Sequence, residues 1–133
     1  MIYLDTSVVL AHLAGEDRRP PASLWRETLT SSRLLEVETW NRLRAHELAD
    51  SHGELARLLI ARVAMLELNQ PVIARALEPF PGPHFPRTLD ALHLASCAWL
   101  RDNGRVVSLA SYDRRMTATA CAMDIPVFDL DAS

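Results

Sequence analysis

Acidic residues stand at the ends or starts of ordered segments in a pattern that suggests one chemical site. Asp5 follows a short apolar strand, Asp90 lies near the start of a helical run, and Asp113 follows a β-rich run. A further acid, at position 36 or 38, follows a short run led by Ser32. Ligands bind outside the carboxyl ends of strands in open α/β sheets, so carboxylates placed there indicate a site rather than a core.

Carboxylates that converge in this way favour a divalent cation. Two of them about 4 Å apart repel each other by roughly 4 kcal/mol at an effective dielectric of 20, so a group of four requires a cation or shared protons. Oxygen ligands from separate segments suit Mg²⁺ or Mn²⁺ better than zinc, which prefers histidine and cysteine. The chemistry typical of such a site is hydrolysis of phosphoryl or phosphodiester groups.

Each acid also has a structural explanation, because Asp and Glu are favoured at helix N-termini, where they cap free amides and meet the positive end of the dipole. Glu36 and Glu38 present a further choice. They point about 200° apart on a helix, so only one of them can face the edge of the sheet. The spacing alone does not decide whether Glu36 or Glu38 faces this edge.

The elements that position these acids alternate between strand and helix. We expect strands at 2–5, 31–35, 65–68, 105–109 and 125–128. We expect helices at 6–14, from 20–21 through Trp25 and Leu29, at 36–50 and 54–65, from about Pro71, and at 88–102 and 113–123. The proline-rich segment 79–86 is expected to be a loop. The alternation predicts an α/β fold, with a central, mainly parallel five-stranded sheet and helices on both faces.

Length and composition narrow the class of protein. A chain of 133 residues fits one domain, residues 1–133, and folds without disulfides. The net charge of −3 argues against binding nucleic acid by bulk attraction, although a metal-dependent nuclease needs only local arginines. No apolar run reaches the roughly 20 residues of a membrane span, so a cytoplasmic protein is expected. The four glycines are too scattered for a phosphate-binding loop.

Four segments together resemble the PIN-domain ribonucleases, specifically the VapC toxins of bacterial toxin–antitoxin pairs. They are Tyr3-Leu4-Asp5-Thr6-Ser7, the run from Ser32 to Glu38, the run from Leu89 to Ser96, and Ser111-Tyr112-Asp113-Arg114-Arg115-Met116. Each segment is modest alone, but their order and spacing are specific. The resemblance covers almost the whole chain and implies a single PIN-like domain.

The resemblance also implies a reaction and a set of residues. The family places its second acid six residues after the serine, which selects Glu38 over Glu36. Asp5, Glu38, Asp90 and Asp113 are then the catalytic residues, and Asp5, Asp90 and Asp113 hold Mg²⁺ or Mn²⁺. The implied reaction is hydrolysis of RNA phosphodiester bonds by water that the metal makes acidic.

Other polar residues near these motifs are weaker candidates. Thr6 and Ser111 carry hydroxyls beside the acids and are candidates to orient a metal ligand or contact phosphate from outside the metal shell, although a helix cap and a turn residue explain them at least as well. Arg87, Arg114 and Arg115 flank the motifs and are weak candidates for binding RNA phosphates, because exposed arginines often do nothing specific.

His93 and the three tryptophans are interpreted as packing residues and not as part of the site. His93 lies one turn from Asp90, but it belongs to a helix rich in alanine and leucine and is expected to be a packed, hydrogen-bonded residue. Trp25, Trp40 and Trp99 fall on apolar helical stripes, which favours burial in a core or interface over stacking on bases.

The resemblance further implies a cognate antitoxin partner and a homodimer built on a helical face. Apolar residues that offer such a surface are Leu24, Trp25, Leu29, Trp40, Leu43, Leu55, Leu58 and Leu59. The main alternative is a catalytically silent PIN-like module that binds protein or RNA and uses its acids only as caps. A phosphatase of the haloacid-dehalogenase type is disfavoured, because it needs a second Asp where Ser7 stands and the chain contains no lysine.

Overall fold

The strands and helices alternate along the chain, as their apolar periodicity predicts. The computed structural model describes residues 1–15 and 17–131. Its strands are β1 (Ile2–Leu4), β2 (Leu29–Ser32), β3 (Ala64–Leu66) and β4 (Ser108–Ala110). Its helices are α1 (Thr6–Ala14), the 3₁₀ helix η1 (Ala22–Arg26), α2 (Leu34–Ala45), α3 (Ala49–Ile60), α4 (Gln70–Ala76), α5 (Thr88–Asp102) and α6 (Arg114–Ala122). The bounds of α1 and α5 are those predicted from the sequence.

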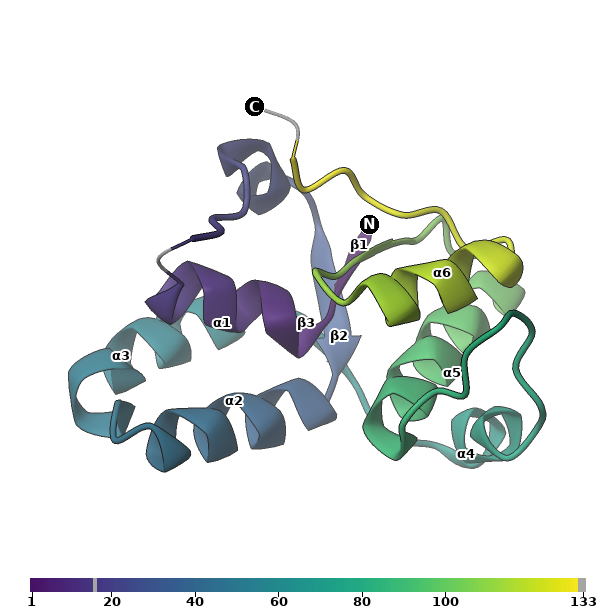
Figure 1. Cartoon of the computed structure of the whole chain (residues 1–133), viewed down its shortest axis with the longest axis horizontal. Coiled ribbons are helices and arrows are strands. Elements are labelled where there is room, and N and C mark those ends of the chain that lie inside the picture. Colours follow the sequence, from purple (N-terminus) through teal and green to yellow (C-terminus); the bar gives the residue numbers. More distant parts are fainter. Residues whose placement is uncertain (16, 132–133) are drawn as a thin grey trace.

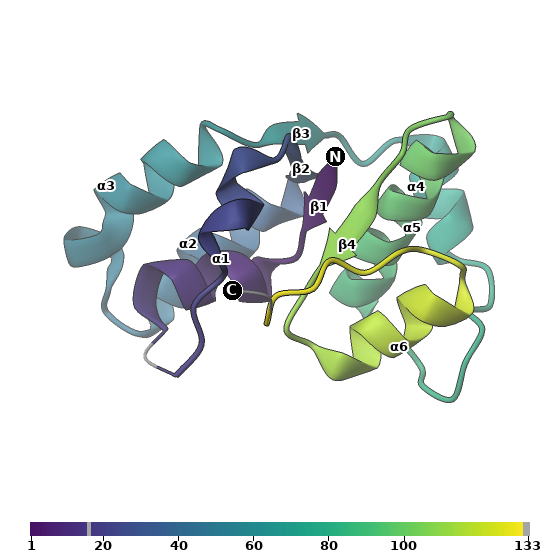
Figure 2. The same ribbon diagram turned by 90° about the horizontal axis from the view of Figure 1, so that it is seen from above.

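The sheet is parallel throughout, with the strand order β3-β2-β1-β4. Helices α1, α2 and α3 lie on one side of it and α4, α5 and α6 on the other (Figure 1, Figure 2). The α/β class and the helices on both faces are therefore confirmed. Because all the strands are parallel, their carboxyl ends meet at one edge of the sheet.

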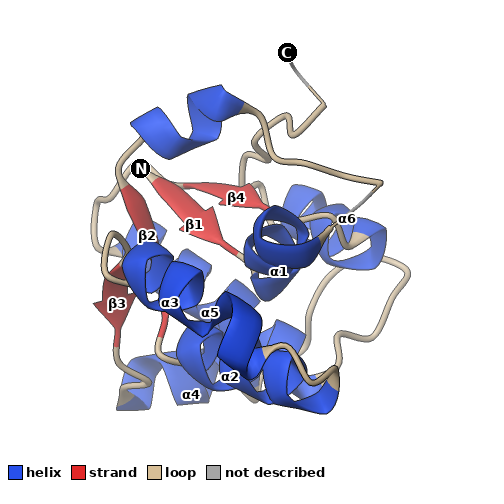
Figure 3. Cartoon of the chain, turned by 90° about the vertical axis from the view of Figure 1, so that its left-hand side faces the viewer, coloured by secondary structure: helices blue, strands red, loops and turns tan. Residues whose placement is uncertain are grey.

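Strand β1 lies between two hydrophobic clusters, because successive side chains of a strand point to opposite faces. Ile2 and Leu4 pack into the cluster beneath α1, α2 and α3, whereas Tyr3 packs into the cluster formed with α5 and α6. Figure 2 shows the sheet between these two helical layers, and Figure 3 shows the molecule from the side of α1, α2 and α3. Burial on both faces explains why β1 is almost wholly apolar.

The predicted fifth strand is not formed as a strand, since the described residues contain a four-stranded sheet. Segment 125–128 makes one isolated parallel bridge, between Leu109 and Val127. Its backbone hydrogen bonds run from Leu109 N to Pro126 O and from Phe128 N to Leu109 O, both at 2.8 Å. Pro126 has no N–H with which to extend this ladder, so the pairing stays local.

Two predicted boundaries near the second strand were wrong. Leu29 does not extend the helix through Trp25; it begins β2 and pairs with Ile2. The strand predicted at 31–35 ends at Ser32, and Leu35 lies fully buried in α2. A short apolar run suits a buried strand and a buried helix equally well, so the periodicity alone does not separate them.

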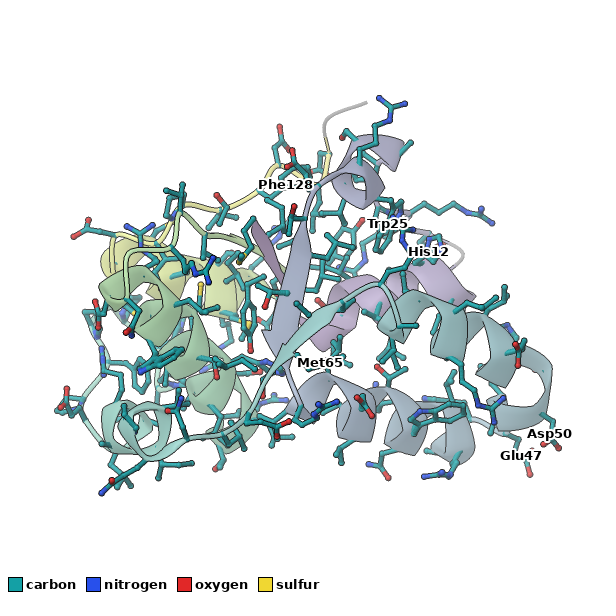
Figure 4. The ribbon with its side chains drawn as sticks, turned by 180° about the vertical axis from the view of Figure 1, so that it is seen from behind. His12, Trp25, Glu47, Asp50, Met65 and Phe128 are labelled. Carbon is teal, nitrogen blue, oxygen red and sulfur yellow. The ribbon has the colours of Figure 1, made fainter. Side chains whose placement is uncertain are left out.

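The tryptophans support the core, as predicted. Trp25 and Trp40 are partly buried against the cluster on the α1–α3 side, and Trp99 packs against the other cluster. Figure 4 shows Trp25 beside His12, and the centroids of their rings are 4.6 Å apart. Within the described part of the chain, none of the helices has the length and apolarity required to cross a membrane.

Candidate active site

All four candidate acids lie near the starts of helices at the carboxyl edge of the sheet. Asp5 directly precedes α1, Glu38 lies in the second turn of α2, Asp90 lies in the first turn of α5, and Asp113 directly precedes α6. In Figure 1 these four helices begin around the arrowhead end of the sheet. The parallel topology therefore brings together acids that are far apart in the sequence.

Asp5 is buried and firmly held. Its backbone N–H donates to the carbonyl of Ala110, which follows from the pairing of β1 with β4. Its Oδ2 accepts hydrogen bonds from Ser7 Oγ at 2.7 Å and from Ser111 Oγ at 2.8 Å. Asp5 makes no side-chain cap to α1. Both hydrogen bonds fall on one oxygen, so Oδ1 has no partner among the described residues.

Glu38 is held in the same way. Its Oε1 accepts from Thr6 Oγ1 at 2.9 Å and lies 2.6 Å from His93 Nε2. Its Oε2 has no partner among residues 1–15 and 17–131. Glu36, by contrast, forms an exposed ion pair with Arg33 at 2.7 Å. The structure therefore directs Glu38, and not Glu36, toward the other acids.

Asp90 is half-buried and accepts no hydrogen bond within the described part of the chain. Its burial is the largest cause that raises the pKa of its carboxyl to about 6. The negative charges of Asp5, Asp113 and Glu38 act in the same direction, and His93 opposes them. An acid whose ionised form is destabilised by three other acids lies where a cation would be favourable.

Asp113 has a structural role that the sequence left open. Its Oδ1 accepts hydrogen bonds from the backbone N–H groups of Arg115 at 3.0 Å and Met116 at 3.2 Å, so it caps α6. Its own N–H donates to Ser111 Oγ at 3.0 Å. Ser111 therefore connects Asp113 to Asp5.

The donor chemistry of the site fits a hard divalent cation. Asp5 and Glu38 each keep one carboxylate oxygen without a partner among the described residues, and Asp90 adds a carboxylate free of protein hydrogen bonds there. Oxygen donors of this kind are those that Mg²⁺ and Mn²⁺ prefer. In the described residues no three His, Cys, Asp or Glu side chains already converge as a metal site.

A cavity of about 140 Å³ lies beside two of the acids. It is lined by Asp90 and Asp113 and, among others, by Arg87, Arg115 and the exposed Phe85. Two of the three arginines singled out in the sequence therefore share a cavity with the acids. Arg114 is exposed and is not part of this lining.

Sequence reasoning placed His93 outside the site and did not include Ser7 among the site residues. His93 is fully buried, as predicted, but it contacts Glu38. The available signal was its position three residues after Asp90, which places both on one face of α5. Ser7 gives no comparable signal, because its bond to Asp5 depends on how α1 leaves the sheet.

Comparison with known proteins agrees with this geometry. The sequence model of the PIN domain matches residues 2–121. The chain belongs to the PIN-domain family. The resemblance of the four sequence motifs to this family is thereby confirmed.

Individual PIN proteins extend the comparison. The chain is 32% identical to Ribonuclease VapC47 of Mycobacterium tuberculosis (strain CDC 1551 / Oshkosh) over 123 residues, which cover 87% of each protein. It is 28% identical to Ribonuclease VapC35 of the same organism over 132 residues, which cover 96% of this chain and 95% of the relative. These relatives confirm the resemblance to the VapC type of PIN domain. A chain of a toxin–antitoxin complex from Klebsiella pneumoniae shares the fold with a TM-score of 0.65 and 13% identity, over 89% of this chain and 91% of that one.

Proposed function

We propose that this chain is a metal-dependent endoribonuclease, the toxin component of a type II toxin–antitoxin pair, and that residues 1–133 form one PIN domain. The observation that carries the proposal is the way in which two carboxylates are held. Asp5 and Glu38 each have one oxygen bound by two side chains and one oxygen left for a ligand. The two M. tuberculosis relatives are both named ribonucleases, which supports the same reaction.

We assign Asp5, Asp90 and Asp113 as the residues that hold Mg²⁺ or Mn²⁺. When bound, such an ion acidifies water and offsets negative charge on the oxygens of a phosphodiester. Glu38 orients the attacking water, and Thr6 and Ser111 hold the acids in position. Held carboxylates of this kind place a reactant without reorganising during the reaction.

Arg87 and Arg115 are the residues of this chain best placed to bind RNA phosphates, because they line the cavity that Asp90 and Asp113 also line. Guanidinium groups match the geometry of a phosphate through paired N–H donors. Arg114 is exposed outside this cavity, and we assign it only a general attraction to RNA. Local arginines of this kind allow a chain with a net charge of −3 to bind RNA at the site without an overall positive charge.

A small antitoxin and a second copy of the chain are the proposed protein partners, and the reaction would take place in the cytoplasm, where the RNA lies. The likeness to a chain of the K. pneumoniae toxin–antitoxin complex supports the antitoxin. Of the apolar residues proposed for an interface, Leu55 and Leu58 are 58% and 59% exposed, whereas Leu24, Leu29, Leu43 and Leu59 are buried in the core. The outer face of α3 is therefore the surface offered for a homodimer.

The test is cleavage of labelled RNA in Mn²⁺, Mg²⁺ or EDTA by the wild type and by an Asp5→Asn/Asp90→Asn variant purified identically. Metal-dependent cleavage that the variant lacks supports the nuclease. Equal cleavage by both proteins indicates a contaminant and contradicts the assignment. A wild type that binds RNA but leaves several RNA classes intact in Mn²⁺ favours the catalytically silent binding module.

A further inference from the structure

A chain of hydrogen bonds runs from the core of the protein into the candidate site. His93 and Tyr3 are both fully buried. Tyr3 Oη lies 2.6 Å from His93 Nδ1, and His93 Nε2 lies 2.6 Å from Glu38 Oε1. The three residues come from β1, α5 and α2, so the chain of contacts forms only when the fold is complete.

The direction of the protons in this chain follows from Glu38. A carboxylate oxygen can only accept a hydrogen bond, so His93 Nε2 donates to Glu38 Oε1 across their 2.6 Å contact. The nearby hydroxyls of Ser31 and Ser96 donate to the carbonyls of Leu4 and Leu92, each at 2.7 Å, so neither directs its proton to the phenol. The phenol of Tyr3 lies 2.6 Å from the other ring nitrogen of His93, Nδ1.

A neutral imidazole has one nitrogen that accepts and one that donates. With the ring proton on Nε2 and donated to Glu38 Oε1, the neutral ring accepts from Tyr3 through Nδ1. Thr6 Oγ1 donates to the same oxygen. Glu38 Oε1 thus accepts two hydrogen bonds from donors held in place, and these bonds fix the orientation of the carboxylate.

We infer that His93 and Tyr3 are positioning residues that hold Glu38 with Oε2 directed to the reacting groups, Tyr3 acting by selecting the tautomer of His93. The inference rests on the proposed function and goes beyond it, because it assigns a role to two core residues that touch neither metal nor RNA. Partners of this kind around a working carboxylate typically change activity 10–100-fold when they are removed.

A purely structural role makes a different prediction. If His93 only fills the core, its replacement lowers stability but leaves the turnover of correctly folded protein unchanged. Cys97 provides a matched control, since it lies one turn further along α5, is also fully buried, and has no contact with Glu38. Cys97→Ala therefore reports the effect of a core defect in the same helix.

The experiment compares His93→Leu, His93→Gln, Tyr3→Phe and Cys97→Ala with the wild type, with rates corrected for the folded fraction. His93→Leu should lower kcat at saturating Mn²⁺ by about 10–100-fold with little change in KM for RNA. His93→Gln retains a side-chain N–H donor and should recover most of kcat. Tyr3→Phe should lower kcat less than His93→Leu, and Cys97→Ala should have wild-type kcat.

A second readout does not depend on catalysis. Nitrogen-15 NMR of the metal-free protein should show His93 with its proton on Nε2, and Tyr3→Phe should change this tautomer or mix it with the other. A proton on Nδ1 in the wild type, or the same kcat for His93→Leu and Cys97→Ala, would overturn the inference. If no RNA is cleaved, the proposed function fails, and the NMR result still decides whether Tyr3 selects the tautomer.

Discussion

Ser111 Oγ lies 2.8 Å from Asp5 Oδ2, although the two residues are 106 positions apart in the sequence. The contact follows from the pairing of β1 with β4, in which Leu4 is opposite Ala110. The residues that follow these partners leave the sheet side by side. One strand register therefore sets the orientation of the most buried acid of the site.

Ser111→Ala should weaken metal binding more than it weakens the fold. The change removes a donor to Asp5 and the acceptor of the Asp113 N–H. We expect the Mn²⁺ affinity, measured from metal-dependent thermal stabilisation, to fall about 10-fold or more. The free energy of unfolding without metal should fall by about 1 kcal/mol. Ser108→Ala, in β4 and three residues before Ser111, is the control. A wild-type response to Mn²⁺ in Ser111→Ala would contradict the role given to the Ser111 hydroxyl.

Asp90→Asn should stabilise the metal-free protein at pH 7. The folded-state pKa of about 6 lies above the ordinary value of 3.8, so ionising Asp90 costs folding free energy. This loss of folding free energy has its full size above pH 6, and it disappears as the pH falls from 6 to below 3.8. After allowance for solvent screening of a half-exposed group, we expect a gain of about 1 kcal/mol, or a few degrees in Tm, at pH 7.

The measurement is thermal unfolding in EDTA at pH 7 and at pH 3.5, where the difference between the two proteins should vanish. Added Mn²⁺ should reverse the order at pH 7, because the wild type gains stability through the bound ion. An equal gain for Asp90→Asn at both pH values would indicate altered packing instead of relieved charge repulsion.

Gly15→Ala should destabilise the end of α1. A Cβ atom at this position would lie 2.5 Å from the carbonyl oxygen of Ala11 and 2.8 Å from that of Arg18. Both contacts are with backbone, which cannot move aside as a flexible side chain does. We expect a loss of about 1–3 kcal/mol, measured by urea denaturation, with the denaturant midpoint lowered. Wild-type stability would show that the chain after α1 adapts without cost.

Local sequence patterns predict much of the fold and of the candidate site. The periodicities of 6–14 and 88–102 predict α1 and α5 with their observed bounds, and Asp5 and Asp90 stand at their starts. The expectation that Thr6 and Ser111 lie against acids agrees with their hydrogen bonds to Glu38 and Asp5. Strand ends and helix starts are local features, so a pattern read along the chain locates them.

The remaining features depend on packing between distant segments. The choice between Glu36 and Glu38 follows from the contacts of Glu38 with Thr6 and His93, which are 32 and 55 positions away in the sequence. An apolar pattern indicates that His93 is buried but not which polar group it meets. The strand predicted at 125–128 forms only one isolated bridge. The apolar periodicity of a segment does not indicate how many of its residues will pair with a neighbouring strand.

RNA cleavage by Glu38→Gln and Glu36→Gln, compared side by side, tests the proposed site with the fewest assumptions. The two residues lie two positions apart on one helix, but Glu38 is held by Thr6 and His93, whereas Glu36 pairs with Arg33 on the surface. We predict that Glu38→Gln lowers kcat in Mn²⁺ by about 100-fold or more and that Glu36→Gln cleaves like the wild type. Wild-type cleavage by Glu38→Gln, or equal losses in both variants, would contradict the site described for this PIN domain.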